Sequence, residues 1–328
     1  MRKMLTVLFI MIVLLFAGWL LLAGPDLPAT APLSELVDSD SRFIEVEGLQ
    51  LHYKKRGSRD PIFLLLHGFG ASLYTWREIM SPMATQATIL AYDRPGFGLT
   101  ERPMEWGLWN PYSDSAQVDI ALALLDHHRV TDAILVGNSA GGTVAVQVAL
   151  RAPERVRALV LISPAIYQTG GLPSWVKPLM RLPPVRYFGL RVLRSSIQDA
   201  GNSLARLAWH DPTLLDSEIM AGYGRPLRAA NWDVGLWNFI LASERPTGLV
   251  GGLAHAQLPL LIVTGDDDRV IPTQDTVRLA SEIGAPLIVL DACGHVPQEE
   301  CPDKLMEALD AFVADLPAQH PTSPADRL

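Results

Sequence analysis

The stretch AILVGNSAGGTVAVQVAL, residues Ala133 to Leu150, changes abruptly from an apolar, β-branched run into small residues with helical spacing. One serine, Ser139, stands at the change, with Gly137 two residues before it and Gly141 two residues after it. A strand that turns sharply into a helix raises the turn residue above the sheet edge in a strained conformation, and only tiny residues fit beside it. The stretch therefore predicts a strand, a tight turn that presents Ser139, and a helix.

Strand-like and helix-like patterns alternate along the chain outside this stretch. Eight runs have strand character, namely FIEV, LQLHYKK, IFLLL, TILAY, AILVG, ALVLIS, LLIVT and LIVL. Runs that are apolar throughout are typical of parallel strands covered on both faces, whereas the first two runs suit an antiparallel pair. Helical patterns cover residues 115–127, 140–152 and 303–314. We therefore expect an α/β protein with a mostly parallel eight-stranded sheet and helices on both faces.

The alternation breaks between Pro164 and Leu258, in a region rich in Trp, Leu, Arg and Pro. The region is too long for one loop, so we expect a helical cap at about residues 168–254, inserted into a domain of residues 42–318. A flexible tail is expected at residues 319–328. The cap carries several large aromatic residues, which either line an apolar pocket or form the cap's own core: Trp175, Tyr187, Trp209, Trp232 and Trp237.

The amino-terminal segment begins with Arg2 and Lys3 and continues as an uncharged apolar run from Met4 to Gly24. This run is long enough to span a bilayer, and longer than the apolar part of most cleaved signal peptides. We predict a membrane anchor at residues 1–24, with a cleaved signal as the alternative, followed by a linker at residues 25–41. The basic residues before the run place the rest of the chain outside the cytoplasm.

Composition narrows the classes of function. The chain has 328 residues, of which 49% are hydrophobic, so it can bury a sizeable core. Its 27 Lys and Arg against 35 Asp and Glu give a net charge of -8, which argues against nucleic-acid partners. Metal-ligand spacings, dinucleotide glycine fingerprints and phosphate loops do not occur, so no cofactor and no metal is predicted. An oxidising compartment would permit a disulfide between Cys293 and Cys301, but we expect the two cysteines to be buried free thiols.

A serine hydroxyl becomes a useful nucleophile only with a base beside it and a carboxylate to orient that base. LLIVTGDDDRVIP places Asp266, Asp267 and Asp268 just beyond one strand, and LIVLDACGHVPQ places His295 just beyond the next. Asp291, within the second of these stretches, is a weaker alternative to the three acids. The sequence thus predicts that Ser139, an aspartate and His295 meet at one edge of the sheet.

A tetrahedral intermediate also needs two fixed N–H donors for its oxyanion. One candidate is the amide of Ala140, directly after the serine. IFLLLHGFGAS supplies the other, because the strand is followed by a loop in which Phe69 offers its amide. His67, in the same loop, is interpreted as a structural residue that holds the loop.

LLLHGFGAS, AYDRPGFGLTERP, LVGNSAGG, GDDDRVIP and ACGHVPQEECPD together resemble the cap-bearing branch of the α/β-hydrolase superfamily, over about residues 43–313. The resemblance implies that Ser139 is the nucleophile, His295 the base and Asp268 the acid of the triad. It also implies the oxyanion donors Phe69 and Ala140.

The resemblance leaves several reactions open. Epoxide hydrolases and haloalkane dehalogenases of this fold carry aspartate where this chain has Ser139. GNSAGG is similar to the elbow of hydrolases that split carbon–carbon bonds in ring-cleavage products, but the loop HGFGAS departs from their His-Gly-x-Gly-Pro-Gly pattern. We expect a membrane-anchored, extracytoplasmic serine hydrolase of apolar or lipid-like esters. A carbon–carbon hydrolase, a perhydrolase or haloperoxidase relative and a non-catalytic ligand-binding module are the alternatives.

Overall fold

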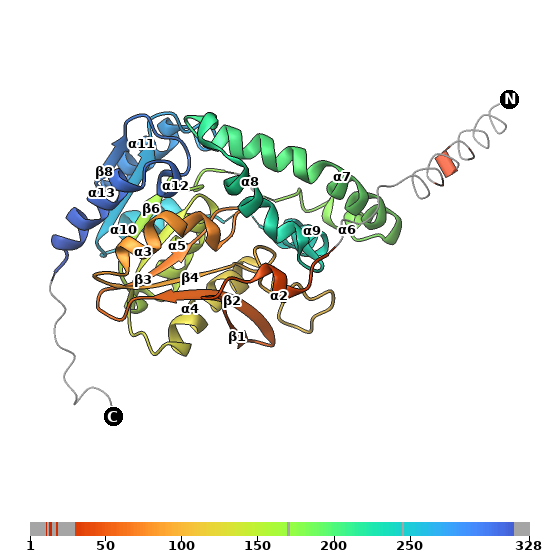
Figure 1. The fold of residues 1–328 in the computed structure, drawn as a ribbon, viewed down its shortest axis with the longest axis horizontal. Helices are drawn as coiled ribbons and strands as arrows, with labels where there is room; N and C mark the ends of the chain where they lie inside the picture. The colour runs from red at the N-terminus through yellow and green to blue at the C-terminus, as the bar shows by residue number, and fades with distance from the viewer. Residues whose placement is uncertain are drawn as a thin grey trace.

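The computed structural model describes residues 30–168, 171–244 and 246–317, together with residues 11, 13, 14 and 18. An eight-stranded sheet runs through the centre in the order β1-β2-β4-β3-β5-β6-β7-β8 (Figure 1). β1 pairs antiparallel with β2 and β2 with β4, and the other neighbours are parallel, which confirms the predicted sheet. The strands are β1 (Arg42–Val46), β2 (Leu49–Arg56), β3 (Ile62–Leu66), β4 (Thr88–Tyr92), β5 (Ala133–Asn138), β6 (Val156–Ile162), β7 (Leu260–Gly265) and β8 (Leu287–Leu290).

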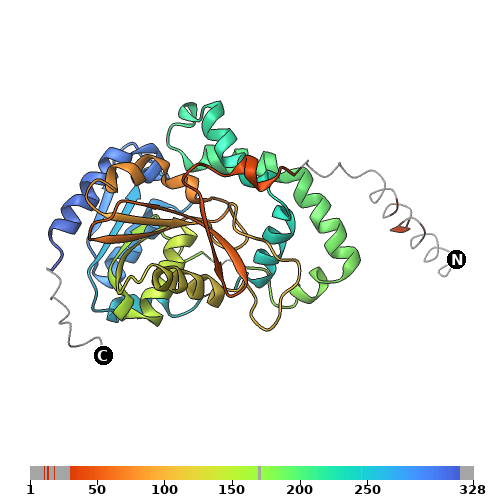
Figure 2. The same ribbon diagram turned by 60° about the horizontal axis from the view of Figure 1, so that its bottom comes forward.

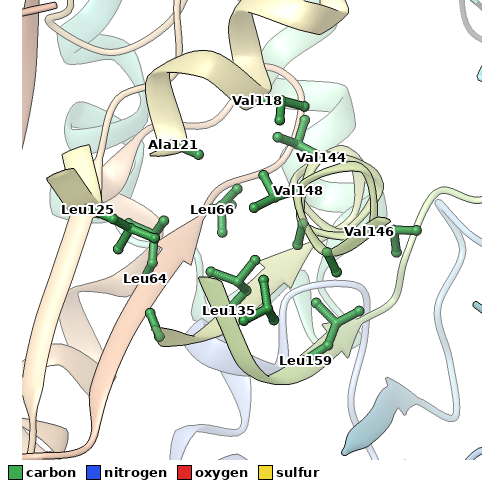
Figure 3. Packing of buried hydrophobic residues seen from close by; sticks show 14 of the residues in the cluster. Leu64, Leu66, Val118, Ala121, Leu125, Leu135, Val144, Val146, Val148 and Leu159 are labelled. Atoms are coloured by element: carbon green, nitrogen blue, oxygen red, sulfur yellow. The ribbon is translucent and has the colours of Figure 1, made fainter. Parts of the chain in front are cut away.

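Each face of the sheet has its own apolar core. Along β3, Leu64 and Leu66 belong to one core, and Phe63 and Leu65 to the other, because side chains alternate along a strand. Figure 3 shows the first core, where Leu64 and Leu66 lie beside side chains of two helices. The helices over this face are α4 (Asp114–His127), α5 (Ala140–Arg151), α10 (Leu249–His255) and α11 (Thr273–Ile283). The opposite face is covered by η1 (Leu73–Trp76), α3 (Arg77–Met83) and α13 (Pro302–Ala314).

The cap follows β6 and lies over one edge of the sheet (Figure 2). Its elements are α6 (Lys177–Met180), α7 (Pro183–Ala208), η3 (Pro212–Leu214), α8 (Ser217–Gly224), η4 (Arg225–Arg228) and α9 (Trp232–Ala242). Helix α10 falls within the range expected for the cap, but Leu249 and Leu253 pack into the main core. The helices that stand away from the sheet are therefore α6 to α9.

Residues 30–41 are not the free tether expected for residues 25–41. Helix α2 (Leu33–Leu36) lies on the cap, the amide of Ala31 donates to the carbonyl of Arg228 at 2.8 Å, and Leu36 is buried against Leu99. Asp38 pairs with Lys54 at 2.6 Å. One buried side chain and a few ion pairs fix such a segment without leaving a periodic apolar pattern in its sequence.

The predicted anchor, residues 1–24, lies outside the described residues apart from four isolated positions. The tail predicted at residues 319–328 also lies outside them. Among the residues that the structure describes, no helix combines the length and the apolar character needed to cross a bilayer.

Candidate active site

Ser139 occupies the turn between β5 and α5 with φ 54° and ψ -123°, a conformation that non-glycine residues rarely adopt. The two glycines around it are needed for space. A Cβ on Gly137 would lie 2.6 Å from the carbonyl oxygen of Gly141, and one on Gly141 would lie 2.0 Å from that of Leu66. The strained serine thus depends on close packing of β3, β5 and α5 at the carboxyl end of the sheet.

His295 and Asp268, which follow β8 and β7, form a buried pair. The Nδ1 atom of His295 lies 2.8 Å from Oδ2 of Asp268, while Oδ1 of Asp268 accepts the amides of Val270 and Ile271 at 2.9 Å each. A carboxylate is an acceptor only, so Nδ1 carries the proton and Nε2 is left with a free lone pair. That tautomer is the one a general base needs.

The other acids considered from the sequence are engaged elsewhere. Asp266 accepts the amide of Cys293 at 3.2 Å, and Asp267 lies 3.0 Å from Nδ1 of His210. Asp291 is exposed, and its backbone carbonyl, not its carboxylate, accepts from Lys304 at 2.5 Å. Asp268 is thus the acid that the structure brings to His295.

The loop that carries His295 is fastened to both the sheet and the cap. The side chain of Asn138, directly before Ser139, donates to the carbonyl of His295 at 3.1 Å. On the other side, the amide of His295 donates to the carbonyl of Ala208, the last residue of α7, at 2.7 Å. These contacts place the elbow, the histidine loop and the end of α7 together. The sequence pattern gave no signal for the role of Asn138 or Ala208.

Glu300, at the end of α12 (Pro297–Glu300), forms a second clamp on the histidine loop. Its Oε2 accepts the amide of Gly294 at 2.8 Å and that of His210 at 2.9 Å, and its Oε1 accepts the amide of Asp211 at 2.7 Å. One carboxylate therefore ties the loop to the segment that follows α7.

Cys293 and Cys301 form a disulfide across this loop, so the expectation of free thiols is wrong. The intervening residues turn back through α12 and bring the two Cα atoms to 6.2 Å, within the usual range for a disulfide. Both sulfurs are thereby unavailable as metal ligands in the one cluster of potential ligands within the described residues, which they form with Glu300.

The two expected oxyanion donors lie beside the serine. Ala140 is the first residue of α5, and the first amides of a helix have no intrahelical acceptor. Phe69 follows Gly68, where a Cβ would lie 3.2 Å from Cβ of Ser139, so this loop lies directly against the serine. The arrangement offers two backbone N–H groups to an anionic oxygen.

His67 fixes the conformation of that loop through two hydrogen bonds. Its Nε2 accepts the amide of Arg94 at 2.9 Å, so the proton is on Nδ1, which donates to the carbonyl of Gly68 at 2.8 Å. Burial and the positive charge of Arg94 lower the pKa of His67 to about 4. The histidine is therefore neutral near pH 7, and its two hydrogen bonds give it a structural role in holding the loop.

Three phenylalanines cluster above the oxyanion loop. The ring of Phe69, 45% exposed, lies 5.6 Å from Phe97 and 6.0 Å from Phe239 of α9, centroid to centroid. The Arg94 guanidinium carbon lies 5.5 Å from the ring centroid of Phe97. Phe97 and Phe239 were not predicted from the sequence, although Phe97 lies in the stretch AYDRPGFGLTERP.

The cap tryptophans occupy different surroundings. Trp209 is buried with Val296, next to His295, and its Nε1 donates to the hydroxyl of Tyr223 at 3.2 Å. Trp237 packs inside the cap, and Trp232 is buried at the start of α9. Trp175 is 73% exposed. Trp209 is thus the one that the contacts place beside the histidine loop. Tyr187 is exposed on α7.

A family model described as alpha/beta hydrolase fold matches residues 61–302. The chain is 30% identical over 298 residues to 2-hydroxymuconate semialdehyde hydrolase of Pseudomonas sp. (strain CF600), covering 84% of this chain and 95% of that protein. It is 27% identical over 284 residues to an uncharacterized hydrolase of Bacillus subtilis (strain 168), YugF, covering 84% and 98%. The fold is similar to the crystal structure of a membrane phospholipase A described as a novel bacterial virulence factor, with TM-score 0.67 and 24% identity, covering 96% of this chain and 99% of that one.

Proposed function

Because the chain belongs to the α/β-hydrolase fold family, we propose that it is a serine hydrolase that cleaves carboxylic esters of apolar, lipid-like substrates. The observation that carries this proposal is the buried 2.8 Å hydrogen bond between His295 and Asp268, beside the strained turn of Ser139. A strained serine, an oriented imidazole and two free amides are the parts that acyl transfer requires.

In the proposed reaction, Oγ of Ser139 attacks the ester carbonyl carbon while Nε2 of His295 takes the hydroxyl proton. The amides of Ala140 and Phe69 donate to the resulting oxyanion, and Asp268 stabilises the imidazolium. The intermediate breaks its carbon–oxygen bond to the alcohol, which leaves with the proton from His295. A water molecule, deprotonated by the same nitrogen, then attacks the acyl-enzyme and releases the carboxylic acid and free Ser139.

The apolar character of the surroundings supports an apolar substrate. Phe69, Phe97 and Phe239 form an aromatic cluster above the oxyanion loop, and Trp209 lies beside the histidine loop. Aromatic side chains of this kind bind acyl chains through buried apolar area. We therefore infer a preference for esters with longer acyl groups over acetate esters.

Covalent labelling tests the assignment of the nucleophile. A fluorophosphonate probe should label the parent chain and should not label Ser139→Ala, which should also lose turnover of p-nitrophenyl esters. Ser281→Ala, an exposed serine of α11, is the matched control and should behave like the parent. Equal labelling of the Ser139→Ala variant and the parent would contradict the proposal.

A carbon–carbon hydrolase is the second candidate, favoured by the 30% identity to 2-hydroxymuconate semialdehyde hydrolase. The two candidates separate when p-nitrophenyl esters and a ring-cleavage product are compared as substrates of the same preparation. Higher kcat/KM for the esters supports the first proposal, and the reverse order supports the second.

We also propose that residues 1–24 anchor the protein and that the hydrolase domain is extracytoplasmic. The apolar run and the preceding basic pair support the anchor, and the Cys293–Cys301 disulfide suits an oxidising compartment. Fractionation tests the anchor: full-length chain in the membrane pellet after carbonate washing supports it. A shortened chain in the soluble extract would instead indicate a cleaved signal and a secreted protein.

A further inference from the structure

The outward part of the cap has a charge unlike that of the rest of the chain. Residues 171–194 contain five basic residues and no acidic residue, within a protein of net charge -8. Arg194 pairs with Asp233 of α9, and in the described part of the chain the other four make no ion pair, although Lys177 donates to the carbonyl of Ser243 at 2.7 Å and Arg191 to the hydroxyl of Tyr187 at 2.5 Å. These four are Lys177, Arg181, Arg186 and Arg191.

Exposed apolar side chains lie among these cations. Trp175 is 73% exposed and Val192 is 65% exposed, and Leu179, Leu182 and Val185 are exposed as well. We call these five residues, with the four unpaired cations, the cap face. Figures 1 and 2 both show the α6 end of α7 standing away from the sheet. The face is therefore open to a partner without any change in the fold.

The side of α7 that carries Val185 and Val192 becomes more polar in the second half of the helix. Val185 and Val192 are seven residues apart and so lie on the same side of the helix. Ser203 continues this side three turns further on, with Ser196 and Asp199 near it, while Leu204 and Leu207, 38% and 43% exposed, are the exposed apolar residues of this half. Exposed Trp, Leu and Val side chains interspersed with Lys and Arg are typical of segments that bind an anionic membrane interface.

The position of Ala31, near the start of the continuously described part of the chain, supports the same partner. Ala31 is hydrogen-bonded to Arg228 of the cap, and the seven residue steps from Gly24 to Ala31 can span at most about 25 Å. If the apolar run that ends at Gly24 lies in a bilayer, the cap is held close to that bilayer. A second copy of the chain fits less well, because a symmetric contact would set the same cations against each other.

We propose that the cap face docks on an anionic lipid bilayer, with Trp175, Leu182 and Val192 in the interface and Arg181 and Arg186 on lipid headgroups. Each cation near such a surface contributes about fivefold to affinity. The proposal rests on the proposed function in its use of the anchor at residues 1–24 and in its consequence, which is that the hydrolase takes its apolar ester from the membrane.

Nitroxide accessibility in vesicles tests the docking. The full chain has no free cysteine among its described residues, so Val192→Cys and Ser203→Cys each give one labelling site on the same side of α7. The labelled proteins are compared in phosphatidylcholine vesicles with and without phosphatidylglycerol. With phosphatidylglycerol, the label at 192 should become severalfold less accessible to a nickel chelate and more accessible to oxygen, whereas the label at 203 should not change.

The charge contribution is tested in the same assay. Replacing both Arg181 and Arg186 by Gln should abolish the phosphatidylglycerol effect at position 192. Equal accessibility at positions 192 and 203 in both vesicles would overturn the proposal, and so would spin–spin broadening at 192, which would indicate a second copy instead. Because the measurement needs no turnover, it stays valid in Ser139→Ala and is independent of whether the ester-hydrolase proposal holds.

Discussion

The hydroxyl of Tyr223, on cap helix α8, donates a 2.7 Å hydrogen bond to the carboxylate of Glu299 in α12, just after His295. Thr75 also donates to this carboxylate, and Arg77 pairs with it. Glu299 is buried, and burial raises the pKa of its carboxyl, so these donors compensate part of the cost of holding a charge there. One carboxylate thus connects the cap, the helices η1 and α3 on one face of the sheet, and the helix that follows the histidine.

Removing the Tyr223 hydroxyl should loosen this connection. Tyr223→Phe removes one of the three donors to Glu299 and the acceptor of the indole N–H of Trp209, and a hydrogen bond to a charged group contributes about 1.5–3 kcal/mol. We expect the free energy of unfolding in urea to fall by about 2 kcal/mol and fluorophosphonate labelling to slow. Tyr187→Phe, an exposed tyrosine of α7, is the control and should change stability by less than about 0.5 kcal/mol. Equal stability of the two variants would contradict the role of Tyr223.

His67 should make the protein less stable in mild acid. Burial, with the charge of Arg94, lowers the pKa of His67 to about 4, against about 6.5 in an unfolded chain. As the pH falls below about 6.5, the unfolded chain therefore binds a proton here that the folded protein does not. The stabilisation is complete above that pH and is lost towards pH 4, a loss of about 3 kcal/mol.

The contribution of His67 is measured as the slope of the free energy of unfolding against pH. Urea unfolding of the parent and of His67→Gln between pH 7 and about pH 4 should show a weaker pH dependence in the variant, by about one proton. The pKa of His128 is also lowered to about 4, by burial and then by Lys55, so part of the slope should remain. His255→Gln, an exposed histidine, should keep the slope of the parent. The same slope in His67→Gln and the parent would show that His67 does not titrate as argued.

The disulfide should stabilise the histidine loop. Cys293 and Cys301 are eight positions apart, and a closed loop of this length contributes about 2–3 kcal/mol in the chain-entropy model. We expect the double variant Cys293→Ser with Cys301→Ser to lose about that much stability and to show lower kcat, because His295 lies inside the loop. Dithiothreitol should produce the same change in the parent and none in the variant. If kcat and the midpoint of urea unfolding were unchanged in the double variant, the hydrogen bonds of Glu300 would be sufficient to hold the histidine loop without the disulfide.

Those parts of the site that depend on neighbouring residues could be predicted from the sequence. The elbow at Ser139 was predictable because its strand, turn and helix follow one another within one stretch, and the glycines that it requires are two residues away. The apolar strands were predictable because burial on both faces leaves a continuous pattern. Asp268 was assigned by resemblance among three adjacent acids, and its hydrogen bond to His295 agrees with that assignment.

The contacts between the cap and the histidine loop were not predictable in the same way. Glu300 bonds the amide of His210, ninety positions earlier, and Tyr223 bonds Glu299 across a comparable separation. Nothing in the spacing of such residues marks them as partners, because the cap brings them together only after it folds. The surroundings of the tryptophans were not predictable either. Trp209 lies beside the histidine loop and Trp175 is exposed, although the sequence places both in one region of helical pattern.

Asp268 provides the most direct test of the proposed triad. Its carboxylate holds the Nδ1 proton of His295, so that Nε2 faces the reaction as a base, and it stabilises the imidazolium that forms. Asp268→Asn replaces an acceptor by a group that can donate, which favours the wrong tautomer. We expect kcat to fall by about 10²–10⁴-fold with the fold intact.

The neighbouring acids are the matched controls for that variant. Asp267→Asn removes the negative charge beside His210, and Asp266→Asn removes the charge while keeping an oxygen that can accept the amide of Cys293, but neither residue is bonded to His295. Each should lower kcat by less than about tenfold. The three variants are compared by kcat on the best p-nitrophenyl ester, with circular dichroism to confirm folding. The largest loss at Asp266 or Asp267 would overturn the assignment, and equal small losses at all three would mean that His295 does not act as the base through this pair.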